Sequence, residues 1–166
     1  MNQHLGSLVG GTVGGALGTA FIQKGMQLSG KLPEPVRPPP PRQDPAEYIL
    51  GRIASWRGRP LAPATHRRAA HGLHWVYGLG WSSLLGLLGP RLGMNRIERA
   101  AVAGAAFGAG VWAVGYLGWL PRAGIVERPR DSRIGPTVTN LLSHVGYGLL
   151  AALPIHLANR IACERM

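Results

Sequence analysis

The sequence predicts an all-α integral membrane protein with four transmembrane helices and one amphipathic helix on the membrane surface. The 166 residues include four long stretches that contain no Asp, Glu, Lys or Arg. Each stretch is close to the roughly 20 residues that a helix needs to cross the hydrocarbon core of a bilayer. The charged residues lie between these stretches, so we predict a single membrane domain over residues 1–166. The predicted spans cover residues 5–23, 70–88, 100–120 and 137–158.

The first span has a glycine at every fourth position. Because residues four apart lie on one face of a helix, this spacing predicts a smooth face that another helix backbone can approach closely. The other helix can belong to the same chain or to a second protein. No Lys or Arg precedes the span, whereas signal peptides carry positive charge there, so we expect a retained helix. The glycines are Gly6, Gly10, Gly14 and Gly18.

Residues 31–60 are predicted to form a proline-rich loop followed by a surface helix. Prolines dominate residues 31–42, which indicates an extended polyproline segment rather than a helix. The helix is expected to begin with Asp44 as its N-cap and Pro45 as its first residue, and to end at Trp56. Its apolar side chains share one face and arginines lie outside that face, as is typical of a helix on a membrane surface. The apolar face consists of Tyr48, Ile49, Ile53 and Trp56.

The second and third spans are joined by a short loop, so we expect them to form an antiparallel hairpin. The third span contains Gly104 and Gly108, four residues apart, which again predicts close packing against another helix. In the fourth span, Pro154 predicts a kink or the end of the regular helix.

Most of the 18 basic residues lie in the first and third loops, on one predicted side of the membrane. The positive-inside rule places these two Pro/Arg-rich loops in the cytoplasm and both termini outside a bacterial inner membrane. We expect the arginines to bind anionic lipid headgroups rather than nucleic acid, because they flank the spans. The two loops contain Lys24, Lys31, Arg37, Arg42, Arg52, Arg57, Arg59, Arg67, Arg68, Arg122, Arg128, Arg130 and Arg133.

An H-x-x-Y-G element occurs twice, at residues 74–78 in the second span and 144–148 in the fourth. Each copy follows a glycine-rich helix and a Pro/Arg-rich loop, so the chain resembles two tandem two-helix units. Tandem units of this kind have the same orientation, so His74 and His144 should lie at similar depths, as in parallel-repeat membrane folds. His71 lies one turn before His74. Tyr77 and Tyr147 are the tyrosines of the two copies, and we expect them to act as polar groups between helices.

Three interpretations of the histidines compete. They can donate hydrogen bonds across helices, supply two axial ligands to a haem b, or form part of a proton or ion path. A quinone site between the second and fourth spans is a variant of the cofactor interpretation. The structural interpretation carries the most weight, so the expected cofactor is none, with haem b as the alternative. Residues typical of a catalytic site are not recognisable, and we expect no enzyme.

The order of these elements resembles the YagU-like family of bacterial inner-membrane proteins. The residues that carry the resemblance are the glycine-rich first helix, the Pro/Arg connector, HGLHWVYGLGWSSLLGLL, the second glycine-rich span and LLSHVGYGLL. The resemblance implies a four-helix inner-membrane protein and supplies no catalytic residue.

From the glycine spacing and the small size of the chain we predict a non-catalytic accessory or scaffold subunit of a larger membrane complex. Its partners would be other membrane protein subunits or a second copy of itself, contacted through the glycine-rich helix faces. A haem- or quinone-binding protein and a small proton or ion transporter are the alternatives.

Overall fold

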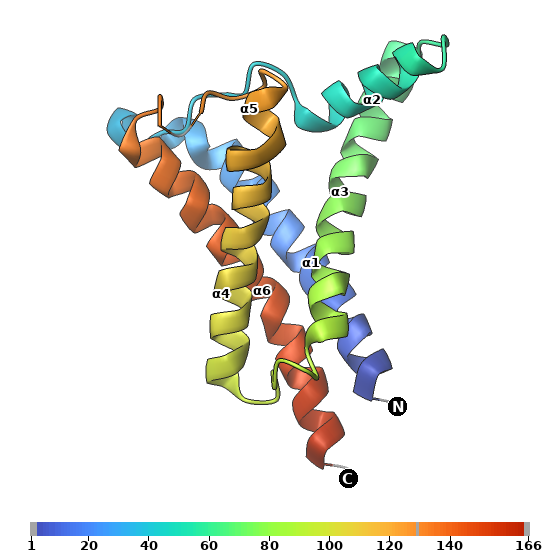
Figure 1. The fold of residues 1–166 in the computed structure, drawn as a ribbon, viewed down its shortest axis with the longest axis vertical. Coiled ribbons are helices and arrows are strands. Elements are labelled where there is room, and N and C mark those ends of the chain that lie inside the picture. The colour runs from blue at the N-terminus through green and yellow to red at the C-terminus, as the bar shows by residue number, and fades with distance from the viewer. Residues whose placement is uncertain (1–2, 129, 165–166) are drawn as a thin grey trace.

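The computed structural model describes residues 3–128 and 130–164, and these residues form helices joined by turns and loops. Four long helices make a bundle: α1 (Gln3–Leu28), α3 (Pro63–Leu88), α4 (Ile97–Trp112) and α6 (Ile134–Glu164). Both ends of the chain lie at one end of the bundle, while α2 (Pro45–Trp56) and the loop before α6 lie at the other (Figure 1). The predicted all-α class is confirmed, and the two Pro/Arg-rich loops lie at the same end, as the four-span topology requires.

The helices are packed in the order α3, α1, α6, α4. Helix α1 packs along both α3 and α6, and α4 packs along α6, whereas α3 and α4 are not neighbours at the level of the backbone. Figure 1 shows α1 and α6 crossing behind α3 and α4, which stand apart from one another. The central pair α1–α6 therefore joins two outer helices, so that each glycine-rich helix contacts the His-Tyr helix of its own repeat.

Three helical segments, rather than the predicted four, are long and apolar enough to cross a membrane. They are Gln3–Lys31, Ile97–Arg122 and Ile134–Glu164, which contain the predicted spans at 5–23, 100–120 and 137–158. Helix α3 has the required length, 26 residues. Its charge-free part, which includes the predicted span at 70–88, is nevertheless not apolar enough, because His71, His74, Ser82 and Ser83 interrupt it. The predicted second span is therefore not confirmed.

The third segment changes its helical geometry before it ends. Residues Ala113–Trp119 continue α4 as a π-helix and lead into the single turn α5 (Leu120–Arg122). Proline lacks an N–H and its ring crowds the carbonyl four residues earlier, so Pro121 leaves the carbonyl of Leu117 without its usual helical partner. The Arg122 side chain donates to this carbonyl at 3.4 Å and to that of Gly118 at 2.5 Å. By contrast, α6 does not end at Pro154 but continues to Glu164.

The proline-rich loop is less extended than predicted. It contains two 3-10 turns, Ser29–Lys31 and Glu34–Val36, of which the second lies inside the segment expected to be polyproline. A 3-10 turn needs one hydrogen bond between backbone groups three residues apart. In the second turn the N–H of Arg37 donates it to the carbonyl of Glu34. The loop is held against α6, where the Thr139 hydroxyl donates to the Val36 carbonyl at 2.8 Å.

The predicted short helix is present as α2. The Asp44 carboxylate accepts hydrogen bonds from the backbone N–H groups of Ala46 and Glu47, at 2.8 and 3.0 Å, as an N-cap should. Helix α2 packs on α3, near the end at which α3 begins (Figure 1).

The bundle has a small interior and an apolar exterior. The buried cluster lies between α3, α4 and α6 near the end that carries the termini, and most large aliphatic side chains point outward. Such an exterior is the arrangement expected where lipid rather than water surrounds the helices. The buried cluster consists of Leu85, Met94, Ala100, Ala151, Ala152 and Ile155.

Candidate functional site

The glycine face of α1 lies against α6. Gly6, Gly10, Gly14 and Gly18 are all buried. A Cβ atom at Gly10 would lie 2.7 Å from the carbonyl oxygen of Pro154, and one at Gly14 would lie 2.7 Å from the Cα of Ala151. A Cβ at Gly18 would overlap the ring of Tyr147. The spacing of four thus serves a contact between two backbones of the same chain.

A second glycine face on the same helix, not singled out from the sequence, lies against α3. A Cβ at Gly11 would lie 2.6 Å from the carbonyl oxygen of Ser82, and one at Gly15 would lie 2.9 Å from the Ser82 Cβ. The pairs Gly10-Gly11 and Gly14-Gly15 in the sequence indicate this second face, because adjacent glycines repeated every four residues create two neighbouring glycine faces on a helix. Helix α1 is therefore able to pack closely on both sides at once.

The glycines of α4 form the third close contact. Gly104 and Gly108 are both buried, and they face the second H-x-x-Y-G element on α6. A Cβ at Gly104 would lie 2.6 Å from the carbonyl oxygen of Gly148, and one at Gly108 would overlap the carbonyl of His144. All six glycines predicted to pack helices thus lie in the interior of this one chain.

Buried hydroxyl groups join α1 to α3 beside the glycines. The Ser7 hydroxyl donates to the carbonyl of Gly86 at 2.6 Å, and the Ser82 hydroxyl donates to the carbonyl of Gly11 at 2.6 Å. Asn159 of α6 donates to the Ser7 oxygen at 3.2 Å, which connects three helices at this end of the bundle. Serines inside charge-free spans were the sequence signal, since polar side chains hydrogen-bond across helices in lipid.

The two tyrosines of the repeat occupy different positions. Tyr147 is buried, and its hydroxyl donates to the carbonyl of Gly78 on α3 at 2.5 Å. Tyr77 is 41% exposed and makes an edge contact with Trp81 of its own helix. The structure thus places Tyr147 between helices, whereas Tyr77 lies at the margin of the bundle.

Aromatic side chains bridge the space between α3 and α4, whose backbones do not meet. Trp81 of α3 contacts Phe107 of α4 edge to face, with ring centroids 6.2 Å apart. Phe107 in turn stacks on Tyr147 of α6 at 6.4 Å. The row of rings that begins at Tyr77 therefore crosses from α3 through α4 to α6.

His144 forms a second group of rings nearer the loop end. The Tyr116 ring, in the π-helical segment, stands edge-on to the His144 imidazole at 5.7 Å and stacks on Trp112 at 6.0 Å. One ring nitrogen of His144, Nδ1, lies 2.8 Å from the carbonyl oxygen of Asn140 one turn earlier. This bond fixes the orientation of the imidazole and leaves Nε2 free of a partner within its own helix.

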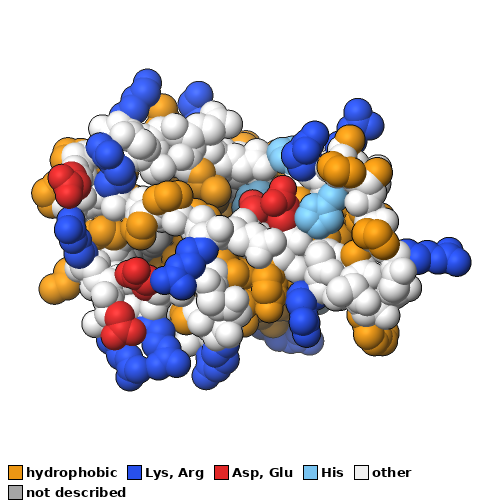
Figure 2. Space-filling model, turned by 90° about the horizontal axis from the view of Figure 1, so that it is seen from above, with side chains coloured by type: hydrophobic (Ala, Val, Ile, Leu, Met, Phe, Trp, Pro, Cys, Tyr) orange, Lys and Arg blue, Asp and Glu red, His pale blue; other side chains and the backbone are white. Residues whose placement is uncertain are grey.

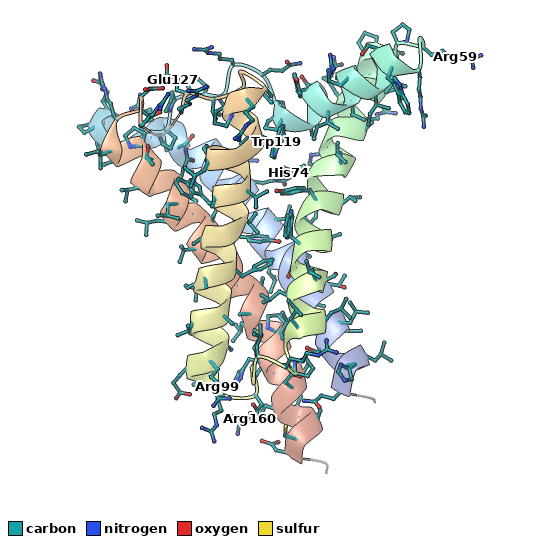
Figure 3. All side chains as sticks on the ribbon, in the orientation of Figure 1. Arg59, His74, Arg99, Trp119, Glu127 and Arg160 are labelled. Atoms are coloured by element: carbon teal, nitrogen blue, oxygen red, sulfur yellow. The ribbon has the colours of Figure 1, made fainter. Side chains whose placement is uncertain are left out.

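His74 extends from α3 toward this group. Figure 3 shows His74 on the side of α3 that faces α4. The charges of His74 and His144 lie within range of one another, and His74 is also within range of the Asp44 carboxylate at the start of α2. The two repeated histidines therefore interact electrostatically, and an acidic group from outside the spans acts on His74. Their similar depth in a membrane stays a prediction.

Two further histidines, His71 and His156, make contacts of their own. His71 is exposed and accepts a hydrogen bond from the Trp75 indole of the same helix at 3.2 Å. His156 lies at the opposite end, where Nδ1 is 2.9 Å from the carbonyl oxygen of Met94. Within residues 3–128 and 130–164, no three His, Cys, Asp or Glu residues are grouped so that they could hold a metal ion.

Comparison of the chain with models of protein families, with curated proteins and with solved structures finds no match. The resemblance to the YagU-like family therefore remains a prediction, and the function has to be argued from the fold itself.

Proposed function

We propose that this chain is a non-catalytic subunit of a membrane complex, an accessory or scaffold protein of the bacterial cytoplasmic membrane. The main support is the row of exposed aliphatic side chains along the outside of α1, because five of the predicted packing glycines contact other helices of the same chain. A partner would consequently meet the large aliphatic side chains on the outside of the bundle rather than the glycine faces. The aliphatic exterior thus replaces the glycine faces as the proposed contact surface, and the proposed role as a subunit of a membrane complex is unchanged.

The outer face of α1 is the best-defined surface of this kind. Its aliphatic side chains repeat every four residues, beside the buried glycines. Leu5, Val9, Val13 and Leu17 are between 48% and 53% exposed, and Phe21 continues the row. Rows of side chains four residues apart are inclined to the helix axis, so this row can receive a helix that crosses α1 at an angle, or lipid acyl chains. A crosslink to a protein distinguishes a partner helix from lipid.

We also propose that α3 crosses the membrane with the other three helices. It packs along α1, which is itself long and apolar enough to span. The buried serine bonds at Ser7 and Ser82 lie along this contact, and they offset the lower apolar character of α3 by satisfying its polar groups internally. Four crossings would place α2 and both Pro/Arg-rich loops on one side, and the termini on the other.

The test is purification of the full chain from its native membrane in mild detergent, with a photo-crosslinking residue at Leu17. The expected result is a crosslink to one defined protein, which is either another subunit or a second copy of the chain. A crosslinker at Gly80, an exposed position on α3, is the matched control. It reports nonspecific crosslinking to abundant membrane proteins. Elution as a lone monomer, with crosslinks from Leu17 to lipid alone, would contradict the proposal.

A second candidate, a haem b or quinone site, is favoured by the arrangement around His144. Its Nδ1 is bonded to the backbone, which is how ligating histidines are usually oriented, and His74 approaches from another helix. The absorption spectrum of the same purified sample tests the haem form of this idea. A Soret band that disappears in His144→Ala and persists in His156→Ala would support it, whereas a colourless protein expressed with ample haem would remove it.

A further inference from the structure

The hairpin formed by α2 and the start of α3, residues 45–68, presents a basic and aromatic surface that is not covered by the rest of the chain. Trp56 is 87% exposed, and Ile53 and Leu61 are each 41% exposed. A shallow hollow lies along α2 and is lined by Arg52, Ile53, Ser55 and Trp56. Large apolar side chains beside an open hollow outside the bundle are unusual unless something covers them.

The charge of this surface is strongly one-sided. Residues 45–68 contain five arginines and a single acidic residue, Glu47. None of the five arginines belongs to an ion pair among the described residues, where the ion pairs involve Arg130, Arg133 and Arg160. Figure 2 shows Lys and Arg side chains around the rim of this end of the molecule, with hydrophobic side chains between them. The five arginines are Arg52, Arg57, Arg59, Arg67 and Arg68.

The position of the hairpin along the bundle suits the headgroup layer. The charge-free part of α3 begins at residue 69, and α3 itself begins at Pro63, so the exposed first turns extend roughly 10 Å beyond the apolar stretch at about 1.5 Å per residue. The headgroup region on each side of a bilayer is roughly 5–8 Å thick. Arginine side chains at this height are long enough to contact lipid phosphates, and a tryptophan ring favours the same layer. Figure 3 shows Arg59 projecting from the far end of the hairpin, away from the bundle.

We propose that the α2–α3 hairpin binds the anionic phospholipid headgroups of the surrounding bilayer, with Trp56 inserted beside them. The inference rests on the membrane location proposed above. Guanidinium groups match the phosphate oxygens of lipids such as phosphatidylglycerol, and the exposed indole and isoleucine supply the apolar contact. Helix α2 would then be pressed onto the membrane, and lipid charge would set the position of the loop that carries Asp44.

The experiment places a nitroxide spin label at position 56, using Trp56→Cys in a Cys163→Ser background. The labelled full chain is reconstituted into nanodiscs of phosphatidylcholine alone or of phosphatidylcholine mixed with phosphatidylglycerol. Accessibility of the label to oxygen and to a water-soluble nickel complex reports its depth. The expected result is a label shielded from nickel in the mixed discs and more exposed in the neutral ones.

A matched pair of variants tests the role of the arginines. The triple change Arg52→Gln, Arg57→Gln and Arg59→Gln should return the label to water and reduce the preference for phosphatidylglycerol at least about tenfold, since each basic residue near the surface adds to binding. The control triple, Arg91→Gln, Arg96→Gln and Arg99→Gln, changes the same charge at the opposite end and should leave position 56 shielded.

A label at Leu17, on the outer face of α1, separates failure of this proposal from failure of the membrane location. If the Leu17 label lies in lipid while position 56 is open to nickel in both kinds of disc, the hairpin faces water and the lipid proposal is wrong. Equal effects of the two arginine triples would also overturn it, because the contact would then reflect overall charge. If the Leu17 label is itself in water, the membrane location has failed first.

Discussion

Replacing Gly14 by alanine should weaken the contact between the two central helices. The new Cβ would lie 2.7 Å from the Cα of Ala151 on α6 and would overlap the Ala151 carbonyl. Nonbonded carbon atoms prefer a separation of about 3.5–4.0 Å, so α1 and α6 would have to separate by about 1 Å. The obstacle is backbone, which cannot rotate away, and overpacking of this kind costs about 1–3 kcal/mol.

The matched control is Gly80→Ala on α3. Gly80 is exposed, and a Cβ there would have no neighbour within 4 Å. Both substitutions place alanine inside a helix and gain about 1 kcal/mol of helix propensity, so their difference isolates the packing term. We expect Gly14→Ala to have a free energy of unfolding about 1–3 kcal/mol below that of Gly80→Ala.

The assay is reversible unfolding of the full chain in mixed micelles with increasing dodecyl sulfate, followed by tryptophan fluorescence. Equal stability of the two variants would refute the α1–α6 contact. The glycine face of α1 would then be available to bind a partner protein.

Three further substitutions test individual contacts. Tyr147→Phe removes the bond to the Gly78 carbonyl and should lower the free energy of unfolding by about 0.5–1.5 kcal/mol in the same titration, the net contribution of one intramolecular hydrogen bond; no change would mean that this bond does not join α3 to α6. Ser7→Ala should cost about 1 kcal/mol or more, because the buried Asn159 amide loses its partner together with the bond to the Gly86 carbonyl, while Ser29→Ala, which removes a solvent-exposed bond to the Met26 carbonyl, should be close to neutral. Asp44→Ala should destabilise α2 by about 0.5–2 kcal/mol and speed its amide hydrogen exchange, leaving α1 exchange unaltered; uniform acceleration in both helices would contradict a local cap.

The long helices were predictable because charge-free stretches and glycine spacing are local properties of the chain. Helices α1 and α6 contain two of the predicted spans, α4 with the π-helical segment and α5 contains a third, and Asp44 caps α2 where the sequence places it. The lower apolar character of α3 is also a local property, because its charge-free stretch contains His71, His74, Ser82 and Ser83. The π-helical turn before Pro121 depends on how the helix adjusts to the proline, which residue spacing does not specify.

Which face meets which helix was not predictable. The spacing of Gly10 and Gly14 indicates a close contact but does not name α6 as the partner. The two tyrosines show the same limit, since identical H-x-x-Y-G elements place Tyr147 in the interior and leave Tyr77 at the margin. The difference arises because α6 lies between α1 and α4, whereas α3 packs mainly on α1.

The four-helix membrane bundle depends on α3 crossing the membrane with the other helices, and labelling with a membrane-impermeant thiol reagent tests this most directly. Ser55→Cys on α2 and Asn95→Cys in the loop after α3 are made separately in a Cys163→Ser background; Ser55 and Asn95 are both exposed. Four crossings predict labelling from opposite sides, with position 95 labelled in intact cells and position 55 labelled only after the membrane is opened. Labelling of both positions from the same side would show that α3 does not cross, and the four-helix membrane bundle would have to be abandoned.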